Sequence, residues 1–125
     1  MILVDTSIWV DHFRNGNPEL KRLLNDNEVA CHPFIILELA CGNLKNRKEI
    51  IILLHALSIV TCVENQEVLS FIEGQKLMGK GLGLVDLHLL SSALLNNVLL
   101  WTLDKNLKQE ARRLNIDYEI KINNS

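Results

Sequence analysis

Four of the fifteen acidic residues in this 125-residue chain lie in its most apolar segments. Asp5 ends the run MILVD, Glu38 lies within FIILELAC, Asp86 within GLVDLHLL, and Asp104 ends VLLWTLD. A carboxylate among buried apolar groups must be paired, bound to a metal ion or protonated, because removing an isolated charge from water is too costly. These four acids are therefore the candidates for chemistry, whereas the other eleven have the polar or mixed surroundings of a solvated surface.

A divalent cation would allow four such carboxylates to share one site. Two carboxylates about 5 Å apart repel each other by about 3 kcal/mol at an effective dielectric constant near 20, and a group of four would raise its own pKa values. Mg²⁺ and Mn²⁺ prefer oxygen ligands and suit such a group. Zinc suits it less well, because the four histidines show no paired ligand spacing and no cysteine accompanies them suitably.

Each acid also has a simpler interpretation. Each of the three aspartates could have no role other than capping a helix, and Glu38 could pair with a distant arginine such as Arg14 or Arg47. Taken alone, each acid indicates little. Four acids in apolar settings, two of them at the ends of predicted strands, are harder to explain independently.

The elements that must position these acids alternate between strand and helix. Short apolar runs predict buried strands at 1–5, 28–32, 58–63, 98–104 and 118–122. Helical patterns occupy 7–14, 18–26, 33–41, 49–57, 65–81, 85–97 and 105–115, and we expect the helix at 49–57 to be buried on most sides. This alternation predicts a single domain over residues 1–125, folded as a three-layer α/β/α sandwich with a mostly parallel sheet of about five strands.

The predicted topology brings the four acids together. In an open α/β sheet, sites form at the carboxyl ends of the strands. Asp5 and Asp104 end two separate strands, Asp86 lies at the start of a helix that can point to the same edge, and Glu38 lies on a helix packed beside them. We therefore expect the four carboxylates to converge.

Composition limits the class of protein. Hydrophobic residues make up 48% of the chain, which is enough to fill one core, and the net charge of −2 argues against a strongly basic nucleic-acid binder without excluding an enzyme with local basic patches. Cys31, Cys41 and Cys62 lie in apolar stretches without a C-x-x-C pair, so we expect reduced core residues in a cytoplasmic protein. We expect neither a signal peptide nor a membrane span, since no uncharged apolar run approaches the roughly 18 residues required.

The segments VDTSIWVDHFR, ELACG, GLVDLHLLSSAL and LLWTLDKNL, in this order, resemble the acidic motifs of PIN-domain ribonucleases. The likeness is strongest to the VapC-type toxins of VapBC toxin–antitoxin modules, and it extends from residue 2 to about residue 120. The resemblance implies an endoribonuclease that depends on Mg²⁺ or Mn²⁺. It also implies that Asp5, Glu38, Asp86 and Asp104 are the catalytic, metal-binding acids.

The resemblance assigns roles to neighbouring polar residues as well. Thr6 or Ser7 would help to position water or substrate phosphate beside Asp5, and Thr102 would hydrogen-bond among the carboxylates. Asn106 stands where many relatives carry an acid. Its amide oxygen can hold a water or a metal ion but adds no charge, which leaves the occupancy of a second metal site open.

The resemblance further implies an RNA substrate, a homodimer and an antitoxin protein whose C-terminal segment enters the acidic groove. Among the cations, we expect Arg14 and Lys105 to lie near the acids and contact phosphate, with further contacts from Lys45, Arg47 and Lys48 in one loop.

Two other enzyme classes fit the sequence less well. A signalling receiver domain would need a phosphoacceptor aspartate near mid-chain, and SIVTCVEN has none. A phosphatase of the D-x-D-x-T type would need a second acid where the chain has Ser7. The remaining alternative is a PIN-like scaffold with weak or no activity that acts by binding a protein, and carboxylate-dependent metal binding would distinguish it from a nuclease.

Overall fold

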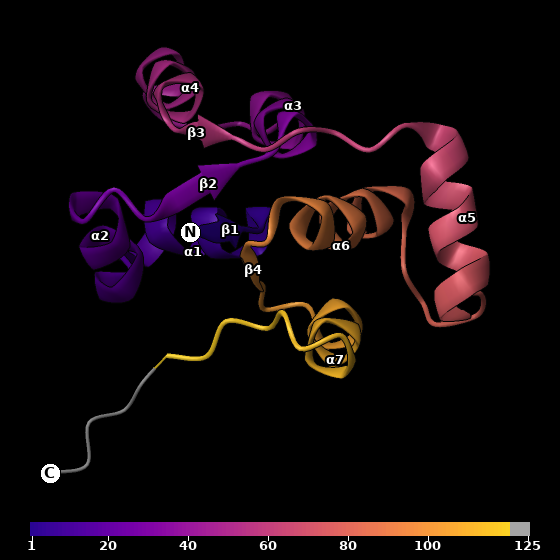
Figure 1. Ribbon diagram of the computed structural model, residues 1–125. Coiled ribbons are helices and arrows are strands. Elements are labelled where there is room, and N and C mark those ends of the chain that lie inside the picture. The colour runs from indigo at the N-terminus through magenta and orange to yellow at the C-terminus, as the bar shows by residue number, and fades with distance from the viewer. Residues whose placement is uncertain (121–125) are drawn as a thin grey trace, which may run out of the picture.

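The computed structural model describes residues 1–120, which form a parallel sheet of four strands surrounded by seven helices (Figure 1). The strands are β1 (Ile2–Val4), β2 (Val29–Cys31), β3 (Ser58–Ile59) and β4 (Leu99–Trp101). The helices are α1 (Thr6–Asn15), α2 (Pro18–Asn25), α3 (Pro33–Cys41), α4 (Arg47–Ala56), α5 (Asn65–Gln75), α6 (Leu84–Asn96) and α7 (Lys105–Arg113).

The strands follow the order β3-β2-β1-β4, and all three pairings are parallel. In the centre of the sheet, Ile2 of β1 lies between Val29 of β2 and Leu99 of β4. Every residue of β1 and β2 is buried. Such continuous apolar strands are typical of a parallel sheet covered on both faces.

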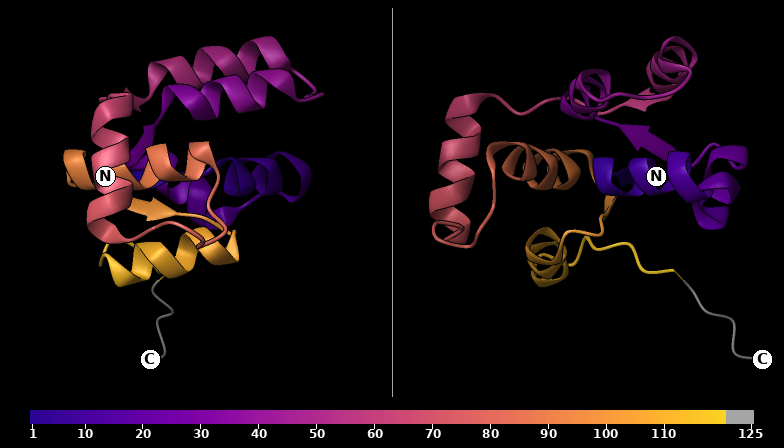
Figure 2. Two further views of the ribbon diagram at one scale, coloured as in Figure 1. Left: turned by 90° about the vertical axis from the view of Figure 1, so that its right-hand side faces the viewer. Right: turned by 180° about the vertical axis from the view of Figure 1, so that it is seen from behind.

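Helices cover the sheet on two sides, which confirms the predicted three-layer architecture. Figures 1 and 2 place α1 and α2 on one side and α5 and α6 on the other, while α3 and α4 pack side by side near the β3 edge. One apolar cluster joins the layers, because Leu3 and Leu100 of the sheet are fully buried together with Trp9 of α1 and Leu90 of α6. The central strands are therefore fixed by packing on both faces.

The strand predicted at 118–122 is not formed in the part of it that the structure describes. Beyond β4, residues 1–120 extend the sheet only by an isolated bridge between Leu100 and Asp117, and residues 121 and 122 lie outside the described residues. Two backbone hydrogen bonds join Ile116 and Tyr118 to Leu100 of β4, and Asp117 forms ion pairs with Lys108 and Arg112 of α7. β4 itself ends at Trp101, three residues earlier than predicted, because the chain turns there toward α7.

The prediction that the helix at 49–57 is buried on most sides is wrong. The helix, α4, begins at Arg47, and Leu54 is its one fully buried side chain, whereas Ile52 is 68% exposed. α4 packs against α3 beside β3, a two-residue edge strand whose own side chains are exposed. Because no further layer of residues 1–120 packs over α4, only one face of this helix is buried.

The three cysteines are free thiols, but only one of them belongs to the core. Cys31 is buried in β2, whereas Cys41 and Cys62 are exposed, which corrects the prediction for these two. The reason is their position. Cys41 is the last residue of α3, and Cys62 lies in the segment that leaves the sheet after β3.

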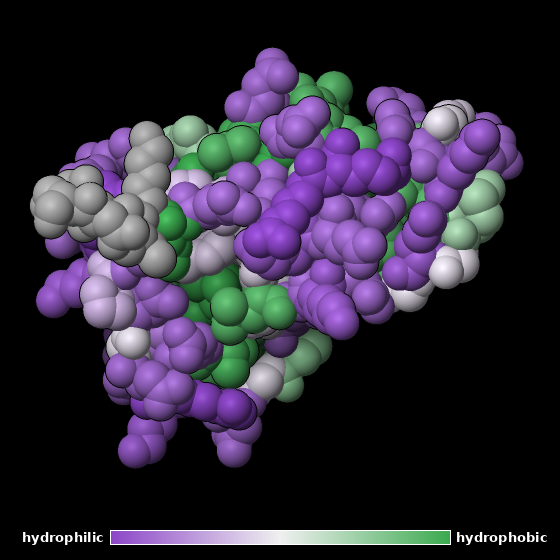
Figure 3. Space-filling view, turned by 90° about the horizontal axis from the view of Figure 1, so that it is seen from below, coloured by the Kyte–Doolittle hydropathy of each residue, from purple (hydrophilic) through white to green (hydrophobic). Residues whose placement is uncertain are grey.

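The surface around α7 is mostly hydrophilic (Figure 3). Leu107 and Ala111 of α7 face the core, while Lys105, Arg112 and Arg113 face solvent. Across residues 1–120, no helix is both long and apolar enough to cross a membrane.

Two glycines in the connection between α5 and α6 adopt positive φ angles but differ in their surroundings. Gly79 (φ +70°) has open space around it, whereas a Cβ atom on Gly81 (φ +73°) would lie 2.6 Å from Nδ2 of Asn106. We expect Gly79→Ala and Gly81→Ala each to lower the free energy of unfolding by about 1 kcal/mol, the cost of a left-handed backbone for an L-residue. Urea unfolding of both variants measures this.

Gly81→Ala should have a second effect that Gly79→Ala lacks. The new methyl group must displace the Asn106 amide, so the NMR signals of that side-chain NH₂ should shift in Gly81→Ala and stay in place in Gly79→Ala. Unchanged Asn106 signals in both variants would contradict the close approach of this connection to α7.

Candidate active site

The starts of three helices meet at the carboxyl edge of the sheet, and each places an acid there. Asp5 is the N-cap of α1, Asp104 is the N-cap of α7, and Asp86 lies in the first turn of α6. Glu38 lies farther along α3, which begins at the end of β2. The N-terminus of a helix favours a negative charge, so the fold supports carboxylates at this edge without a cationic partner.

Asp5 is the most constrained of the four acids. It is buried at 8% exposure. Its Oδ2 atom accepts hydrogen bonds from the hydroxyl groups of Thr102 (2.6 Å) and Ser7 (3.0 Å), and its Oδ1 atom accepts one from the backbone N–H of Thr6 (2.8 Å). These three hydrogen bonds fix the orientation of the carboxylate. Oδ2 is fully engaged, so Oδ1 keeps the remaining capacity to bind a ligand.

The Thr6 hydroxyl links Asp5's neighbourhood to α3 by donating a hydrogen bond of 2.8 Å to Oε1 of Glu38. The predicted burial of Glu38 is wrong, because its side chain is exposed. Ile35, Ile36 and Leu39 face the core, and Glu38 points away from them on the opposite side of α3, beside Leu37, which is 60% exposed. The buried apolar residues near Glu38 in the sequence therefore lie on the opposite face of α3.

The suggested pairing of Glu38 with an arginine is not what the structure contains. Arg47 instead donates a hydrogen bond of 3.0 Å to the carbonyl oxygen of Ala40. α3 itself is anchored at its start by buried His32, whose Nδ1 atom accepts a hydrogen bond from the backbone N–H of Phe34. Burial lowers the pKa of His32 to about 4, so the imidazole is neutral and can act as this cap.

A second pair of contacts ties Asp104 to the same centre. The Thr102 hydroxyl that donates to Asp5 also accepts a hydrogen bond of 3.0 Å from the backbone N–H of Asp104. The Ser7 hydroxyl accepts one of 3.0 Å from the backbone N–H of Leu103. These two hydroxyls thus join the start of α1 to the turn that carries Asp104. Sequence reasoning expected a role for both residues but could not identify these backbone partners.

Asn106 lies next to this turn, where its backbone N–H donates a hydrogen bond of 3.0 Å to Oδ1 of Asp104. Its side-chain amide lies over Gly81, so the connection between α5 and α6 approaches the acids closely. This contact was not predicted from the sequence, in which only the glycine-rich connection between α5 and α6 indicates a close approach.

The four carboxylates interact through space. Burial raises the pKa of Asp86 above the ordinary value of an aspartate, and Asp104, Asp5 and Glu38 raise it further by repulsion, while a hydrogen bond from the backbone N–H of Gly83 opposes the shift. All three of the other acids therefore lie close enough to act on Asp86. The structure brings the four predicted acids to one place.

No cation balances these charges within residues 1–120. The ion pairs found there use Glu19, Asp26, Glu110, Asp117 and Glu119, and none includes one of the four acids. A hard divalent cation fits a donor set made only of carboxylate oxygens.

The arrangement of the carboxylates suits an ion that retains water. Over residues 1–120, no three acidic, histidine or cysteine side chains form a set of direct ligands as they stand. Mg²⁺ usually keeps several waters and binds one or two carboxylates directly. Direct contacts from some acids and water-mediated contacts from the others would satisfy such an ion.

The two cations expected near the acids lie in different places. Lys105 directly follows Asp104 as the first residue of α7 and is exposed. Arg14, expected close to Asp5, lies instead toward the far end of α1, nine residues or about 13 Å along the helix.

The apolar surface beside Glu38 was not anticipated. A shallow hollow of about 500 Å³ there is lined mainly by Phe34, Leu37, Cys41, Leu84 and Val85.

Comparisons with known proteins agree with this geometry. A family model of the PIN domain matches residues 2–113. Ribonuclease VapC32 of Mycobacterium tuberculosis, in strains CDC 1551 / Oshkosh and ATCC 25618 / H37Rv, is 47% identical over 109 residues, which cover 86% of this chain and 88% of that protein. The crystal structure of PAE2754 from Pyrobaculum aerophilum has the same fold, with a TM-score of 0.63 at 18% identity over 87% of this chain and 78% of that one.

The raised pKa of Asp86 makes the stability of the fold depend on pH. Between the unfolded and folded pKa values, the folded chain binds more protons than the unfolded chain, so stability falls as the pH rises above about 4. We expect Asp86→Asn to be more stable than the wild type at neutral pH in EDTA, because the amide has no charge to bury and can still accept the Gly83 hydrogen bond. Urea unfolding across a pH series measures the difference.

The gain from Asp86→Asn should shrink as the pH falls through the raised pKa of the folded chain, and it should be lost below the unfolded pKa of an aspartate, about 4. Glu73→Gln, at an exposed position of α5, is the matched control and should change stability little. A difference between Asp86→Asn and the wild type that does not vary with pH would contradict the electrostatic account.

Proposed function

The chain belongs to the PIN-domain family, and we propose that it is a metal-dependent endoribonuclease, the toxin component of a type II toxin–antitoxin system. The observation that carries this proposal is the group of four carboxylates, in which three raise the pKa of the fourth and none has an ion-pair partner within residues 1–120. The likeness of the chain to Ribonuclease VapC32 supports RNA as the substrate.

In this proposal, Asp5, Glu38, Asp86 and Asp104 hold Mg²⁺ or Mn²⁺ at the carboxyl edge of the sheet. When bound, such an ion lowers the pKa of a water molecule and offsets the charge that develops on a phosphodiester during hydrolysis. The acids differ in how they are held, since Asp5 is buried and accepts three hydrogen bonds, while Glu38 and Asp104 are exposed and each accepts one.

The hydroxyl residues act as positioning residues. Thr102 and Ser7 occupy Oδ2 of Asp5 and direct Oδ1 outward, and Thr6 holds Glu38 beside it. Lys105, at the start of α7, is exposed next to Asp104 and is placed to contact a phosphate of the substrate. Asn106 contributes an uncharged amide where a fifth acid would increase the repulsion.

We also propose a cognate antitoxin, a homodimer and a cytoplasmic location. The acidic edge supports an antitoxin, because an arginine from a partner would supply the same counter-charge as the metal ion. Exposed apolar residues beside the acids, Leu37 and Leu84 among them, support a protein partner on that surface.

Removing one carboxylate should abolish activity without unfolding the chain. We expect Asp5→Asn and Glu38→Gln each to lower divalent-dependent RNA cleavage by about 100-fold or more, a loss of roughly 3 kcal/mol in transition-state stabilisation. Cleavage of total RNA, with sequencing of the new 5′ ends, measures this for the wild type and both variants. Glu73→Gln should cleave as the wild type does.

Calorimetric titration with Mn²⁺ separates the nuclease from a scaffold that acts only by binding protein. The nuclease should bind Mn²⁺ in the wild type and far more weakly in Glu38→Gln. Equal Mn²⁺ binding by both proteins, or full cleavage by Asp5→Asn, would refute the assignment of the acids.

Thr102 should influence the metal ion only through Asp5 and Asp104. Thr102→Val removes the hydroxyl that joins them, so we expect Mn²⁺ affinity to fall about 10- to 100-fold and the free energy of unfolding to fall by about 1–3 kcal/mol. Thr102→Ser keeps the hydroxyl and should recover most of the Mn²⁺ affinity. If Thr102→Val unfolds less readily than expected and binds Mn²⁺ normally, the positioning role is wrong.

A further inference from the structure

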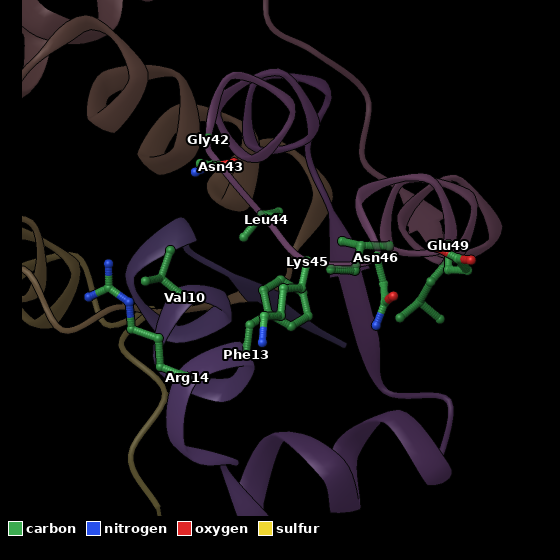
Figure 4. A pocket seen from close by; sticks show the side chains of 11 residues that line it. Val10, Phe13, Arg14, Gly42, Asn43, Leu44, Lys45, Asn46 and Glu49 are labelled. Carbon is green, nitrogen blue, oxygen red and sulfur yellow. The ribbon is translucent and has the colours of Figure 1, made fainter.

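A hollow of about 760 Å³ opens beside the acidic edge, between the second half of α1, the connection 42–46 and α4 (Figure 4). Its apolar lining includes Val10 and Phe13 of α1, Leu44, and Leu53 of α4. Neither the acids nor the positioning hydroxyls belong to this lining. The hollow is therefore a surface distinct from the group of acids that would bind the metal ion.

The hollow continues the surface of the acidic edge along two helices. Thr6, Val10 and Phe13 are spaced by four and three residues, so they lie on one face of α1. Thr6 touches Glu38, and the same face reaches Phe13 about 10 Å farther on. Gly42, the residue that follows α3, lies four residues after Glu38 and lines the hollow. A chain bound at the acids can thus continue into the hollow.

The hollow also carries polar groups suited to a nucleotide. Arg14 and Lys45 are its cations, and neither takes part in the ion pairs found within residues 1–120. Figure 4 shows the Arg14 side chain extending from α1 on the side of Val10. A phosphate between the hollow and the acids would lie within reach of this guanidinium group.

Groups that can recognise a base also line this hollow. Asn46, the N-cap of α4, makes no capping hydrogen bond with its side chain, and Figure 4 shows its amide extending away from α4. Glu49 adds an acceptor for the amino group of a base. Half-buried Phe13 offers an aromatic ring, on which unstacked bases of single-stranded RNA commonly pack.

We propose that this hollow, defined by Phe13, Arg14, Lys45 and Asn46, binds a nucleotide of the RNA substrate next to the cleaved bond and sets base preference. The inference rests on the proposed ribonuclease function. The competing occupant is an amphipathic helix of a protein partner, which the apolar lining would also accept. The unpaired cations favour RNA, because a continuous strand bound at both places needs positive charge between a base pocket and a cluster of acids.

Binding of a labelled, random-sequence single-stranded RNA in EDTA tests the phosphate contacts, because cleavage is then prevented. We expect Arg14→Gln and Lys45→Gln each to weaken binding about fivefold and to reduce the slope of log K against log salt by roughly 0.7, the loss of one phosphate contact. Lys21→Gln removes the same charge from an exposed position of α2 and should change neither quantity.

Two further variants test base recognition. Asn46→Gly keeps the left-handed backbone of this position (φ 56°) while removing the amide, so it should alter the sequences around the cleavage sites and leave the salt slope unchanged. Phe13→Leu keeps an apolar side chain and should weaken RNA binding about tenfold through lost stacking. Thermal unfolding by circular dichroism verifies that each variant is folded.

The outcomes separate this proposal from the function on which it rests. If Asp5→Asn loses cleavage while Arg14→Gln and Lys45→Gln bind RNA like Lys21→Gln, the nuclease assignment stands and the nucleotide site is refuted. Variants that bind RNA normally but lose the antitoxin protein would assign the hollow to that partner and also refute the site. A wild type that binds RNA through these residues but cleaves none would refute the proposed function alone.

Discussion

Repulsion among four carboxylates governs the carboxyl edge of this sheet. Asp5, Asp86 and Asp104 are brought there by the starts of three helices, and Glu38 by the face of α3 that points away from the core. The pKa of Asp86 is raised by burial and then by each of the other three acids. The described part of the chain supplies no ion pair to any of them, so a bound cation would relieve the repulsion that remains.

The fold tolerates this repulsion because packing and hydrogen bonds hold the acids from behind. β1 is buried on both faces, and Asp5, the most buried of the four acids, follows it directly. Thr102 and Ser7 then link Asp5 to the turn that carries Asp104. A site supported in this way keeps its geometry before the cation arrives, which is the general requirement for binding charge that develops in a reaction.

The architecture could be predicted from the sequence because it depends on local patterns. Apolar runs interrupted by helical periodicity are visible in the letters, and an acid such as Asp5 at the end of an apolar run marks a strand end. Burial of individual side chains is less visible. The apolar neighbours in FIILELAC suggested a buried Glu38, yet Leu37 and Glu38 face solvent, because this short helix has only one covered side. Contacts between distant segments, such as Asn106 against Gly81 or Ser7 with Leu103, depend on the exact path of two loops, and the residues of either segment do not identify the partner.

The most direct test of the central claim is anomalous diffraction from crystals soaked in Mn²⁺. The account predicts a manganese peak among the carboxylates of Asp5, Glu38, Asp86 and Asp104, bound directly by some and through water by others, with the Thr102 hydroxyl still on Asp5. Manganese bound only elsewhere on the molecule, with these four carboxylates turned apart and no ion between them, would contradict it.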